Sequence, residues 1–548
     1  MIAVATMVGH LRTHWLAIAV FVALSVVHTW PLATNPAALS LNDNGDAQLN
    51  EWILAWVFHQ LPRDPANLFD GNIFYPAKDS LAFSEPLLVP AILAAPVFGL
   101  GGSPVLAYNL LLLVGFTLTA LATYAVVLSW TEDRPAALVA GSLFAFNTHT
   151  LTRLAHLQAI HAYGLPLALL CTDRLIRQPR VSAALCLAIT MSVMVYTSGY
   201  LVVFATLTIA VALITRVAEW RRSRRAVLSG FALAAMTTAL VALPIALPYR
   251  RVAIEQGMVR SVESVRQFSA TPTGYLAATG RLHLSTWSAR FSANPVDTFF
   301  PGVVAIGLAA FGLWHTLRTG AHSSRVLMLF CVGATGFVLS LGLKTPFYGW
   351  LYAVFPPMQG LRAAARFGNL FLLAIAILAG FGLAALRRRH VAQRWALSAA
   401  IAVVLLVNIE ALRAPFTYRP FDGISRVYDL LAMETGRVVL AETPFYPAHA
   451  AFENAEYVLN STAHWRPLMN GYSGYTPASY RRVAWTFWYF PREHAINAMR
   501  DAGVTHFTVH PHRFGDKAEE TIDLLSRRPD IELVAIGAGR RTRLYRFR

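Results

Sequence analysis

Long apolar runs separated by short arginine-rich connectors recur along the sequence from Trp15 to Leu412. Many of these runs reach the roughly 20 residues that an α-helix needs to cross the hydrocarbon core of a bilayer. Of the 548 residues, 56% are hydrophobic and only 14% are charged, a composition too apolar for a soluble protein of this length. Most of the chain is therefore expected to lie in a membrane as a bundle of helices.

The positive charge of the chain follows the connectors. A formal net charge of +17 in a soluble protein would suggest nucleic-acid binding. Here the arginines gather in connectors at 174–180, 216–225 and 387–394, as they do in cytoplasmic loops under the positive-inside rule. The basic excess therefore indicates topology, and no nucleic-acid partner is expected.

With these connectors inside, the apolar runs predict a polytopic α-helical protein with about eleven crossings. The predicted spans lie at 14–33, 104–130, 135–149, 158–174, 181–197, 199–215, 226–247, 300–318, 325–343, 366–386 and 395–412. The first is interpreted as a retained signal anchor with a cytoplasmic N-terminus. An odd number of crossings then puts the polar tail on the opposite side, in the periplasm or outside the cell.

Two domains are expected: a transmembrane domain at 1–412 and a small extracytoplasmic α/β domain at 413–548. Residue patterns in the tail predict strands at 437–441, 504–510, 531–536 and 542–547, and helices at 491–502 and 517–527. The transmembrane domain includes a first outer loop at 31–80. The apolar segment at 81–103 follows it, and its prolines predict a re-entrant rather than a spanning segment.

The first outer loop carries an acid that is suited to catalysis. Asp46 precedes the segment 47–61, in which Trp52 and Trp56 at helical spacing predict a helix lying in the membrane interface. A carboxylate at this depth could deprotonate an acceptor hydroxyl, and the same carboxylate could instead be the N-cap of the helix.

Two further acids are candidates for a catalytic role, and each could instead have a purely structural role. Asp43 could be a second acid, a metal ligand or a solvated turn residue. Glu85 begins an apolar segment before Pro86, and an ionisable side chain near membrane depth is costly unless it has a function. A turn-initiating role before the proline is the alternative for Glu85.

Cationic and polar side chains crowd a short connection between two predicted spans. Arg153 and His156 could hold an anionic phosphate together with Gln158, because the guanidinium fork matches phosphate oxygens. Hydrogen bonding between spans is the structural alternative. The separation of His156 and His161 does not match a usual zinc spacing.

A second cationic group lies on the outer loop at 344–366. It comprises Lys344, Tyr348, Arg362 and Arg366, with the two arginines one helical turn apart. Cations on the outer side oppose the positive-inside rule, which indicates an anionic ligand such as a lipid-linked phosphate. Contact with lipid headgroups is the alternative.

These features resemble the GT-C superfamily of membrane glycosyltransferases. The resemblance is carried by Asn44-Gly45-Asp46, by the proline-rich segment after Ser84-Glu85-Pro86, and by stretches such as Phe69-Asp70-Gly71-Asn72 and Gln359-Gly360-Leu361-Arg362. It implies transfer of a sugar, usually with inversion, from a polyprenyl-phosphate-linked donor to a glycan, lipid or protein acceptor. The reaction would take place at the outer face of the bacterial cytoplasmic membrane, among the membrane lipids.

The resemblance also implies roles for single residues. Asp46 matches the first-loop general base, while Ala47 replaces the second acid of the protein O-mannosyltransferases and argues against that specificity. No cofactor is required, although Asp43, Asp46 and Glu85 leave a divalent cation, Mg²⁺ or Mn²⁺, as an open alternative. The competing hypotheses are a transporter or flippase of lipid-linked saccharides and a scaffold whose tail binds a partner.

Overall fold

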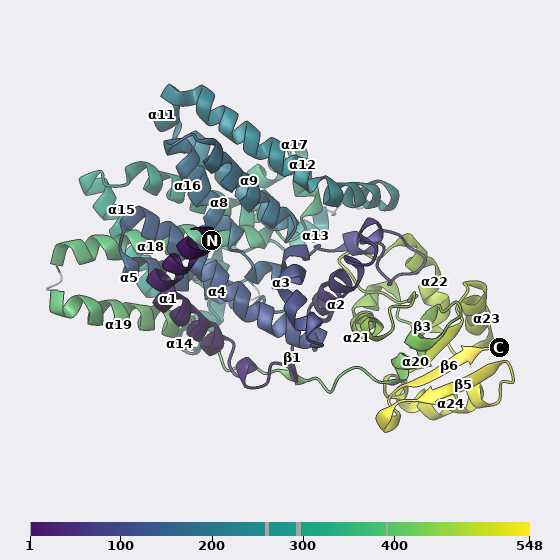
Figure 1. Ribbon diagram of the computed structural model, residues 1–548. Helices are drawn as coiled ribbons and strands as arrows, with labels where there is room; N and C mark the ends of the chain where they lie inside the picture. The colour runs from purple at the N-terminus through teal and green to yellow at the C-terminus, as the bar shows by residue number, and fades with distance from the viewer. Residues whose placement is uncertain (1, 258–261, 292–296, 391–392) are drawn as a thin grey trace. The chain divides into compact units, whose positions relative to one another are not determined.

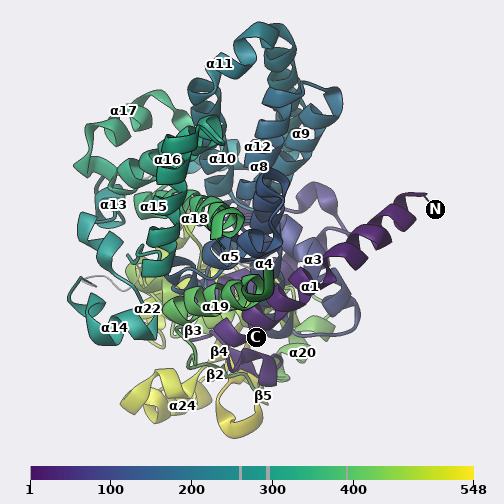
Figure 2. The same ribbon diagram turned by 90° about the vertical axis from the view of Figure 1, so that its left-hand side faces the viewer.

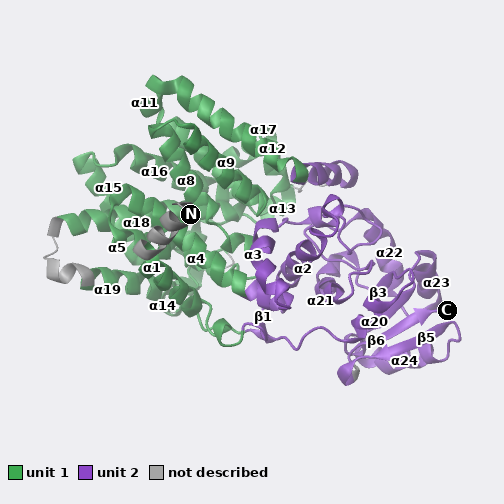
Figure 3. Cartoon of the chain, viewed as in Figure 1, with its two compact units in different colours: residues 1–35, 110–244, 259–417 green, residues 36–109, 245–258, 418–548 purple. Residues whose placement is uncertain are grey.

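The computed structural model (Figure 1) describes residues 2–257, 262–291, 297–390 and 393–548, so residues 391 and 392 of the 387–394 connector lie outside the described part. The chain divides into two compact units (Figure 3). The helical unit comprises residues 1–35, 110–244 and 259–417, and the mixed unit comprises residues 36–109, 245–258 and 418–548. The first outer loop and the tail thus belong to the same unit. A domain boundary at residue 413 stays a prediction.

A helix occupies the main part of each range in which the sequence predicts a span (Figures 1 and 2). These helices are α1 (Ile2–His28), α4 (Pro104–Thr131), α5 (Arg134–Ala145), α8 (Gly164–Arg177), α9 (Val181–Val195), α10 (Gly199–Thr215), α12 (Arg224–Gln256), α15 (Val303–Thr319), α16 (Ser323–Ser340), α18 (Gly368–His390) and α19 (Gln393–Ala411). Short helices in the connections are α6 (Thr148–Leu151), α7 (Leu157–Ile160), α11 (Val217–Trp220), α13 (Val262–Gln267), α14 (Arg281–Thr286) and α17 (Pro346–Val354).

Length and hydropathy separate these helices into two groups. Among the described residues, the segments long and apolar enough to cross a membrane are Pro104–Thr131, Val217–Gln256, Ser323–Ser340 and Ala364–Arg388. The other apolar helical stretches, such as His14–His28 in α1 and Ser398–Ala411 in α19, are 10–17 residues long. The number of crossings, about eleven, therefore stays a prediction.

Two predicted spans are shorter in the structure because polar residues interrupt them. α5 ends at Ala145, and Asn147 then caps α6 by accepting a hydrogen bond from the Thr150 N–H at 2.8 Å. The predicted span at 158–174 is divided into α7 and α8 at His161, whose Nε2 lies 3.0 Å from the Leu111 carbonyl oxygen.

α18 packs against α15 and α16 in the helical unit (Figure 2). The backbones of α15 and α18 meet at Gly312 and Gly382. A Cβ atom on Gly382 would lie 1.9 Å from the carbonyl oxygen of Leu308, and one on Gly312 would lie 2.7 Å from that of Leu378. Small residues allow such close approach between membrane helices, and no side chain fits at this crossing.

Ion pairs join the arginine-rich connectors at one end of the helical unit. Asp173 in the last turn of α8 accepts hydrogen bonds from Arg216 Nη1 at 2.6 Å and from Arg325 Nη2 at 2.8 Å. Asp133, before α5, accepts from Arg387 Nε at 2.8 Å. The connectors that the topology places inside the cell therefore lie at the same end of the unit. The side of the membrane that this end faces stays a prediction.

The tail contributes a mixed sheet with the strand order β3-β4-β6-β5, at the positions that the sequence predicts. β3 (Leu440–Thr443) is parallel to β4 (His506–Val509), while β6 (Arg543–Phe547) is antiparallel to both β4 and β5 (Ile531–Ile536). Its helices are α20 (Val427–Met433), α21 (Ala455–Asn460), α22 (Ala478–Trp488), α23 (Glu493–Asp501) and α24 (Ala518–Ser526). A further pair, β1 (Leu39–Ser40) with β2 (Arg419–Pro420), joins the first outer loop to the start of the tail.

Backbone hydrogen bonds also join the first outer loop to the tail within the mixed unit. The Phe74 N–H donates to the Asn470 carbonyl at 3.0 Å, and the Tyr75 N–H donates to the Leu468 carbonyl at 2.9 Å. The Leu468 N–H returns a bond of 2.7 Å to the Asn72 carbonyl. The stretch Phe69–Tyr75 is therefore held as if it were an added strand.

α2 (Gly45–Gln60) is not the interfacial helix that the sequence predicts. Every residue from Ala47 to Val57 is buried, with Trp52 and Trp56 only 1% and 5% exposed. The Trp52 indole donates to Asn72 Oδ1 at 3.0 Å, and the Trp56 indole donates to the Leu68 carbonyl at 2.8 Å. Because these polar edges bond to the protein, the tryptophans anchor the helix inside the mixed unit, and their rings do not face lipid headgroups.

The proline-rich segment at 81–103 forms a short apolar helix. The 3₁₀ turn η3 (Ser80–Phe83) precedes α3 (Leu88–Gly99), which contains Pro96. α3 packs against α2. Its 12 residues fit a segment that does not cross the bilayer, and re-entry into the membrane stays a prediction.

The glycine crossing leads to a stability prediction. Gly382→Ala should lower the melting temperature of the purified protein, because overpacking of this kind costs about 1–3 kcal/mol or more. Gly307→Ala in α15 is the matched control, since a Cβ atom there meets nothing within 4 Å. Thermal unfolding in detergent measures both variants, and equal melting temperatures would contradict the proposed close crossing.

Candidate functional site

Asp46 lies in the first turn of α2, in the mixed unit. The N-cap is Asn44, whose Oδ1 accepts a hydrogen bond from the Asp46 N–H at 2.9 Å. The N-cap alternative for Asp46 is therefore wrong, because the helix already begins at Gly45. The half-buried Asp46 carboxylate lies where the helix dipole stabilises negative charge.

Tyr472 from the tail fixes the orientation of this carboxylate. Its hydroxyl donates to Asp46 Oδ1 at 2.7 Å. Gly45 permits the approach, because a Cβ atom there would lie 3.2 Å from both Tyr472 Cε1 and Ala455 Cβ. A hydrogen bond to an ionised acceptor is stronger than one between neutral groups, so the pair is well suited to hold a general base in place.

Glu51, further along α2, is fully buried. With its amide oriented so that both side chains are satisfied, Asn42 donates to the two Glu51 carboxylate oxygens at 3.0 and 3.2 Å. Burial raises the pKa of the Glu51 carboxyl well above its ordinary value, and the bond from Asn42 opposes this shift. Burial therefore favours the neutral form of Glu51, and the side chain is enclosed away from any acceptor.

The other two predicted acids also lie in the mixed unit. Asp43 is exposed in the turn before α2. Glu85 is half-buried beyond η3 and interacts electrostatically with Tyr249, whose hydroxyl donates to the neighbouring Ser84 carbonyl. Catalytic roles for Asp43 and Glu85 stay predictions.

In the helical unit, the buried acid Asp297 interacts electrostatically with two of the predicted cations, Arg153 and Lys344. Asp297 is 7% exposed, and its Oδ2 accepts a hydrogen bond from the Thr271 N–H at 3.0 Å. Burial raises the pKa of the Asp297 carboxyl to about 6, while the Thr271 bond and the charges of Arg153 and Lys344 act in the opposite direction. The ammonium group of Lys344 also donates to the Ala270 carbonyl at 2.8 Å.

Arg362 and Arg366 do not lie one helical turn apart, as the sequence predicts. The backbone is extended at Leu361, and the 3₁₀ turn η9 (Ala364–Phe367) begins only after Ala363. Tyr200 nevertheless joins the two arginines. Its hydroxyl accepts from the Arg362 N–H at 3.1 Å, and the Arg366 guanidinium lies 4.6 Å from the centre of its ring.

The remaining predicted binding residues differ in burial. Tyr348 is fully buried and contacts the Phe367 ring edge to face, with 6.3 Å between ring centres. His156 is half-buried before α7, and Gln158 is buried within it. Among the described residues, no group of three His, Cys, Asp or Glu side chains is arranged to hold a metal ion.

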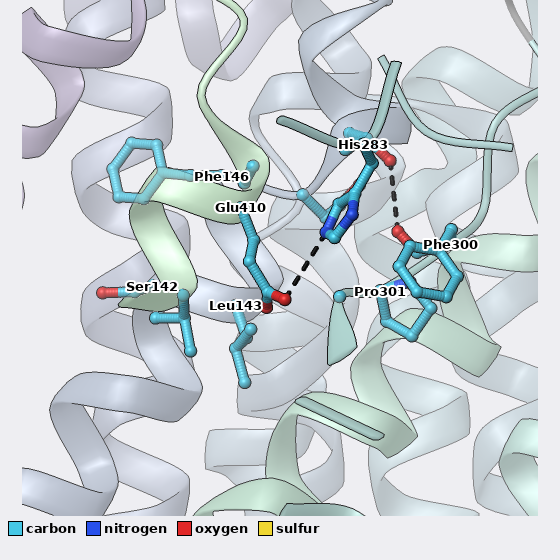
Figure 4. Close-up of a pocket in the computed structure, with 12 residues that line it drawn as sticks. Ser142, Leu143, Phe146, His283, Phe300, Pro301 and Glu410 are labelled. Atoms are coloured by element: carbon cyan, nitrogen blue, oxygen red, sulfur yellow. Dashed lines mark hydrogen bonds and ion pairs between the residues drawn. The ribbon is translucent and has the colours of Figure 1, made fainter. Parts of the chain in front are cut away.

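Glu410 and His283 both line a small cavity in the helical unit (Figure 4). Glu410 accepts from the N–H groups of Val303 and Val304 at 3.0 and 3.1 Å, and it lies 3.4 Å from His283 Nε2. The volume of about 10 Å³ suffices for a single water. Glu410 therefore serves as the cap of α15, and a sugar does not fit in this cavity.

Tyr472, Tyr200 and Asp297 are the site residues that sequence reasoning missed. The hydrogen bond from Tyr472 to Asp46 joins positions 426 residues apart, so no local spacing could indicate it. Asp297 gave a usable signal, because an acid directly before the apolar Phe299-Phe300 pair and a predicted span is costly to bury.

The buried Glu51 gives a pH-dependent prediction. Its folded-state pKa lies above the ordinary value of 4.5, so the stability that it contributes is fully present below pH 4.5. This contribution is lost as the pH rises through the folded-state pKa. Glu51→Gln keeps the shape of the side chain without the ionisation, so the melting temperature of the parent should fall relative to the variant as the pH rises from 4.5.

Melting curves of the parent and of Glu51→Gln, recorded at a series of pH values from 4.5 upwards, measure the difference in melting temperature. Glu263→Gln is the control, since Glu263 is exposed and pairs with Arg266 at 2.7 Å. Parallel pH curves for the parent and Glu51→Gln would show that burial does not hold Glu51 neutral.

Neither a family model nor a curated protein matches the sequence. Among solved structures, the chain is similar to arabinofuranosyltransferase AftD from Mycobacteria, with a TM-score of 0.65 and 16% identity over 98% of this chain and 40% of AftD. For oligosaccharyltransferase AglB from Archaeoglobus fulgidus, the TM-score is 0.48 and the identity 11%, over 92% of this chain and 70% of AglB. For ArnT from Cupriavidus metallidurans, these values are 0.41 and 14%, over 97% and 98% of the two chains.

The likeness to AftD extends over nearly the whole of this chain, which spans 40% of the length of AftD. It covers the helices of the membrane part together with the first outer loop that carries Asp46. The chain therefore shares the fold of AftD over nearly its whole length.

Proposed function

We propose that the protein transfers a sugar from a polyprenyl-phosphate-linked donor to a hydroxyl of a glycan, lipid or protein acceptor. The observation that carries the proposal is the pair formed by Asp46 and Tyr472, in a chain with the GT-C fold. Because AftD is named an arabinofuranosyltransferase, a pentofuranosyl donor is the first to assay, with hexosyl donors next.

Asp46 is the proposed general base of a single displacement. It takes the proton of the acceptor hydroxyl while that oxygen forms a bond to the anomeric carbon. The bond from the anomeric carbon to the phosphate oxygen breaks, and the polyprenyl phosphate leaves with the electron pair. Attack opposite the leaving group inverts the anomeric configuration. Tyr472 keeps the carboxylate oriented throughout.

Cations of the helical unit are the proposed contacts of the departing phosphate. Arg362 and Arg366 are held around Tyr200, and neither guanidinium is paired with a carboxylate in that arrangement. Arginine matches phosphate oxygens in a bidentate geometry and stabilises the charge that grows in the transition state. Arg153, His156, Gln158, Lys344 and Tyr348 complete the proposed binding set.

The proposed location is the bacterial cytoplasmic membrane, with the N-terminus in the cytoplasm and residues 413–548 on the outer side. The arginine-rich connectors at one end of the helical unit support this orientation under the positive-inside rule. The mixed unit also supports it, because the tail and the outer loop with Asp46 must then lie on the same side.

The assignment of the base is tested by Asp46→Asn. This substitution keeps an oxygen that can accept from Tyr472 and removes the basicity, so transfer should fall by about 10²–10⁴-fold. The measurement is transfer of radiolabelled sugar from a polyprenyl-phosphate donor by the full chain in proteoliposomes.

Two further variants sharpen this test. Tyr472→Phe should lower the turnover number less than Asp46→Asn does, because the base remains and only its orientation is lost. Asp64→Asn is the matched control on the same loop, since the Asp64 carboxylate accepts a local bond from Asn67 at 2.8 Å. Full transfer by Asp46→Asn would refute the assigned base.

The mechanism also predicts the effect of chelation. Because protein cations stabilise the leaving phosphate, incubation with EDTA should leave the transfer rate unchanged. The same proteoliposome assay measures this rate before and after chelation. Loss of transfer that Mg²⁺ or Mn²⁺ restores would instead add a divalent cation to the mechanism.

A further inference from the structure

A cavity of about 320 Å³ lies beside the end of α8 and the start of α9, in the helical unit. Arg174, Arg177 and Arg180 line it, together with Ser182 and Cys186. It belongs to the end of the unit at which the arginine-rich connectors meet, and it plays no part in the proposed sugar transfer. Its volume is of the order needed for a phosphate-bearing headgroup.

The three lining arginines carry charge that the protein does not neutralise. Their side chains are exposed, and among the described residues their guanidinium groups form no ion pair or hydrogen bond. Asp173 also lines the cavity, but its carboxylate is already paired with Arg216 and Arg325, at 2.6 and 2.8 Å. The cavity wall is therefore cationic and offers several guanidinium forks to a phosphate.

The first turn of α9 also faces this cavity, through Ser182 and Ala183. This helix has 15 residues, and its N-cap residue, Arg180, makes no side-chain capping bond. The Ala183 N–H already donates to the Arg180 carbonyl at 3.0 Å, so the N–H groups of Val181 and Ser182 are those that favour an anion. They add to the attraction that the arginines provide.

An apolar stripe also runs along α9, the helix whose Ser182, Ala183 and Cys186 line the cavity. Val181, Leu185 and Ile189 follow at intervals of four residues and are 66%, 41% and 65% exposed. Side chains at this spacing lie on one face of a helix. A cationic cavity continued by an exposed apolar stripe matches a molecule that has an anionic head and hydrocarbon chains.

We propose that this cavity binds the phosphate headgroup of an anionic membrane phospholipid, whose acyl chains lie along the α9 stripe. A free phosphate shares the headgroup chemistry but has nothing to contact the stripe. The positive-inside orientation would expose the cavity to the cytoplasmic leaflet, in which anionic lipids are concentrated. Zwitterionic lipids add a positive charge that the three arginines disfavour.

Cys186 provides a direct readout, because it is exposed and lines the cavity, whereas Cys171 is buried and Cys331 is partly buried. Alkylation of the full chain by N-ethylmaleimide in detergent micelles is followed by peptide mass spectrometry. Phosphatidylglycerol at ten times its dissociation constant should slow alkylation of Cys186 by roughly tenfold. Phosphatidylcholine should leave the rate unchanged, and equal protection by both lipids would overturn the proposal.

Substitutions test whether the arginines provide the binding. The double variant Arg174→Gln with Arg177→Gln should need about tenfold or more phosphatidylglycerol for the same protection, since it loses two charge-assisted contacts. Arg221→Gln with Arg222→Gln removes the same charge from exposed side chains outside the cavity and should behave as the parent. Each variant is compared with its own rate in the absence of lipid, which corrects for altered thiol reactivity.

Inorganic phosphate and glycerol 3-phosphate distinguish the two sources of the anion. Weak or no protection by either compound, at concentrations at which the lipid protects, supports the lipid. Protection equal to that of the lipid would assign the cavity to a soluble phosphate and overturn the lipid assignment. Undiminished lipid protection in the Arg174 and Arg177 double variant would overturn the site itself.

Discussion

The helical unit depends on a buried carboxylate at the end where its connectors meet. Asp173 is 2% exposed and accepts hydrogen bonds from Arg216, Arg325 and the Trp130 indole, which lie on or next to α10, α16 and α4. Removal of one partner from such a buried pair typically costs about 3–5 kcal/mol. Asp173 thus ties the ends of four helices together, and their positions along the bundle follow from it.

Lipid explains why the helices could be predicted from the sequence. Backbone groups in a bilayer must bond within their own segment, so each long apolar run has little choice but a helix. The residue at which a helix begins or ends depends instead on the capping side chains. Asn147 ends α5 early through its cap, and Asn44 starts α2 in place of Asp46. Hydropathy alone carries no information of this kind, and therefore it also misplaced Trp52 at the membrane surface.

The candidate site was predictable residue by residue but not as an arrangement. Asp46 could be selected from its place before a predicted helix and from the family resemblance, and Arg366 because cations on the outer side oppose the positive-inside rule. Their partners Tyr472 and Tyr200 could not, because tyrosine is common and the contacts join distant parts of the sequence. The same limit applies to Glu51, which folding buries together with Asn50. Long-range packing decides which of the two acids on this helix is buried and which is only half-buried.

Two groups of arginines in the described part of the helical unit are held in different ways, and the difference bears on function. Arg216, Arg325 and Arg387 meet carboxylates, so their charge is neutralised in the fold. Arg362 lies over the Phe268 ring and Arg366 over the Tyr200 ring, at 5.1 and 4.6 Å from the ring centres. An aromatic face positions a guanidinium without cancelling its charge. Arginines held in this way remain able to attract a phosphate, whereas those paired with acids serve mainly to join helices.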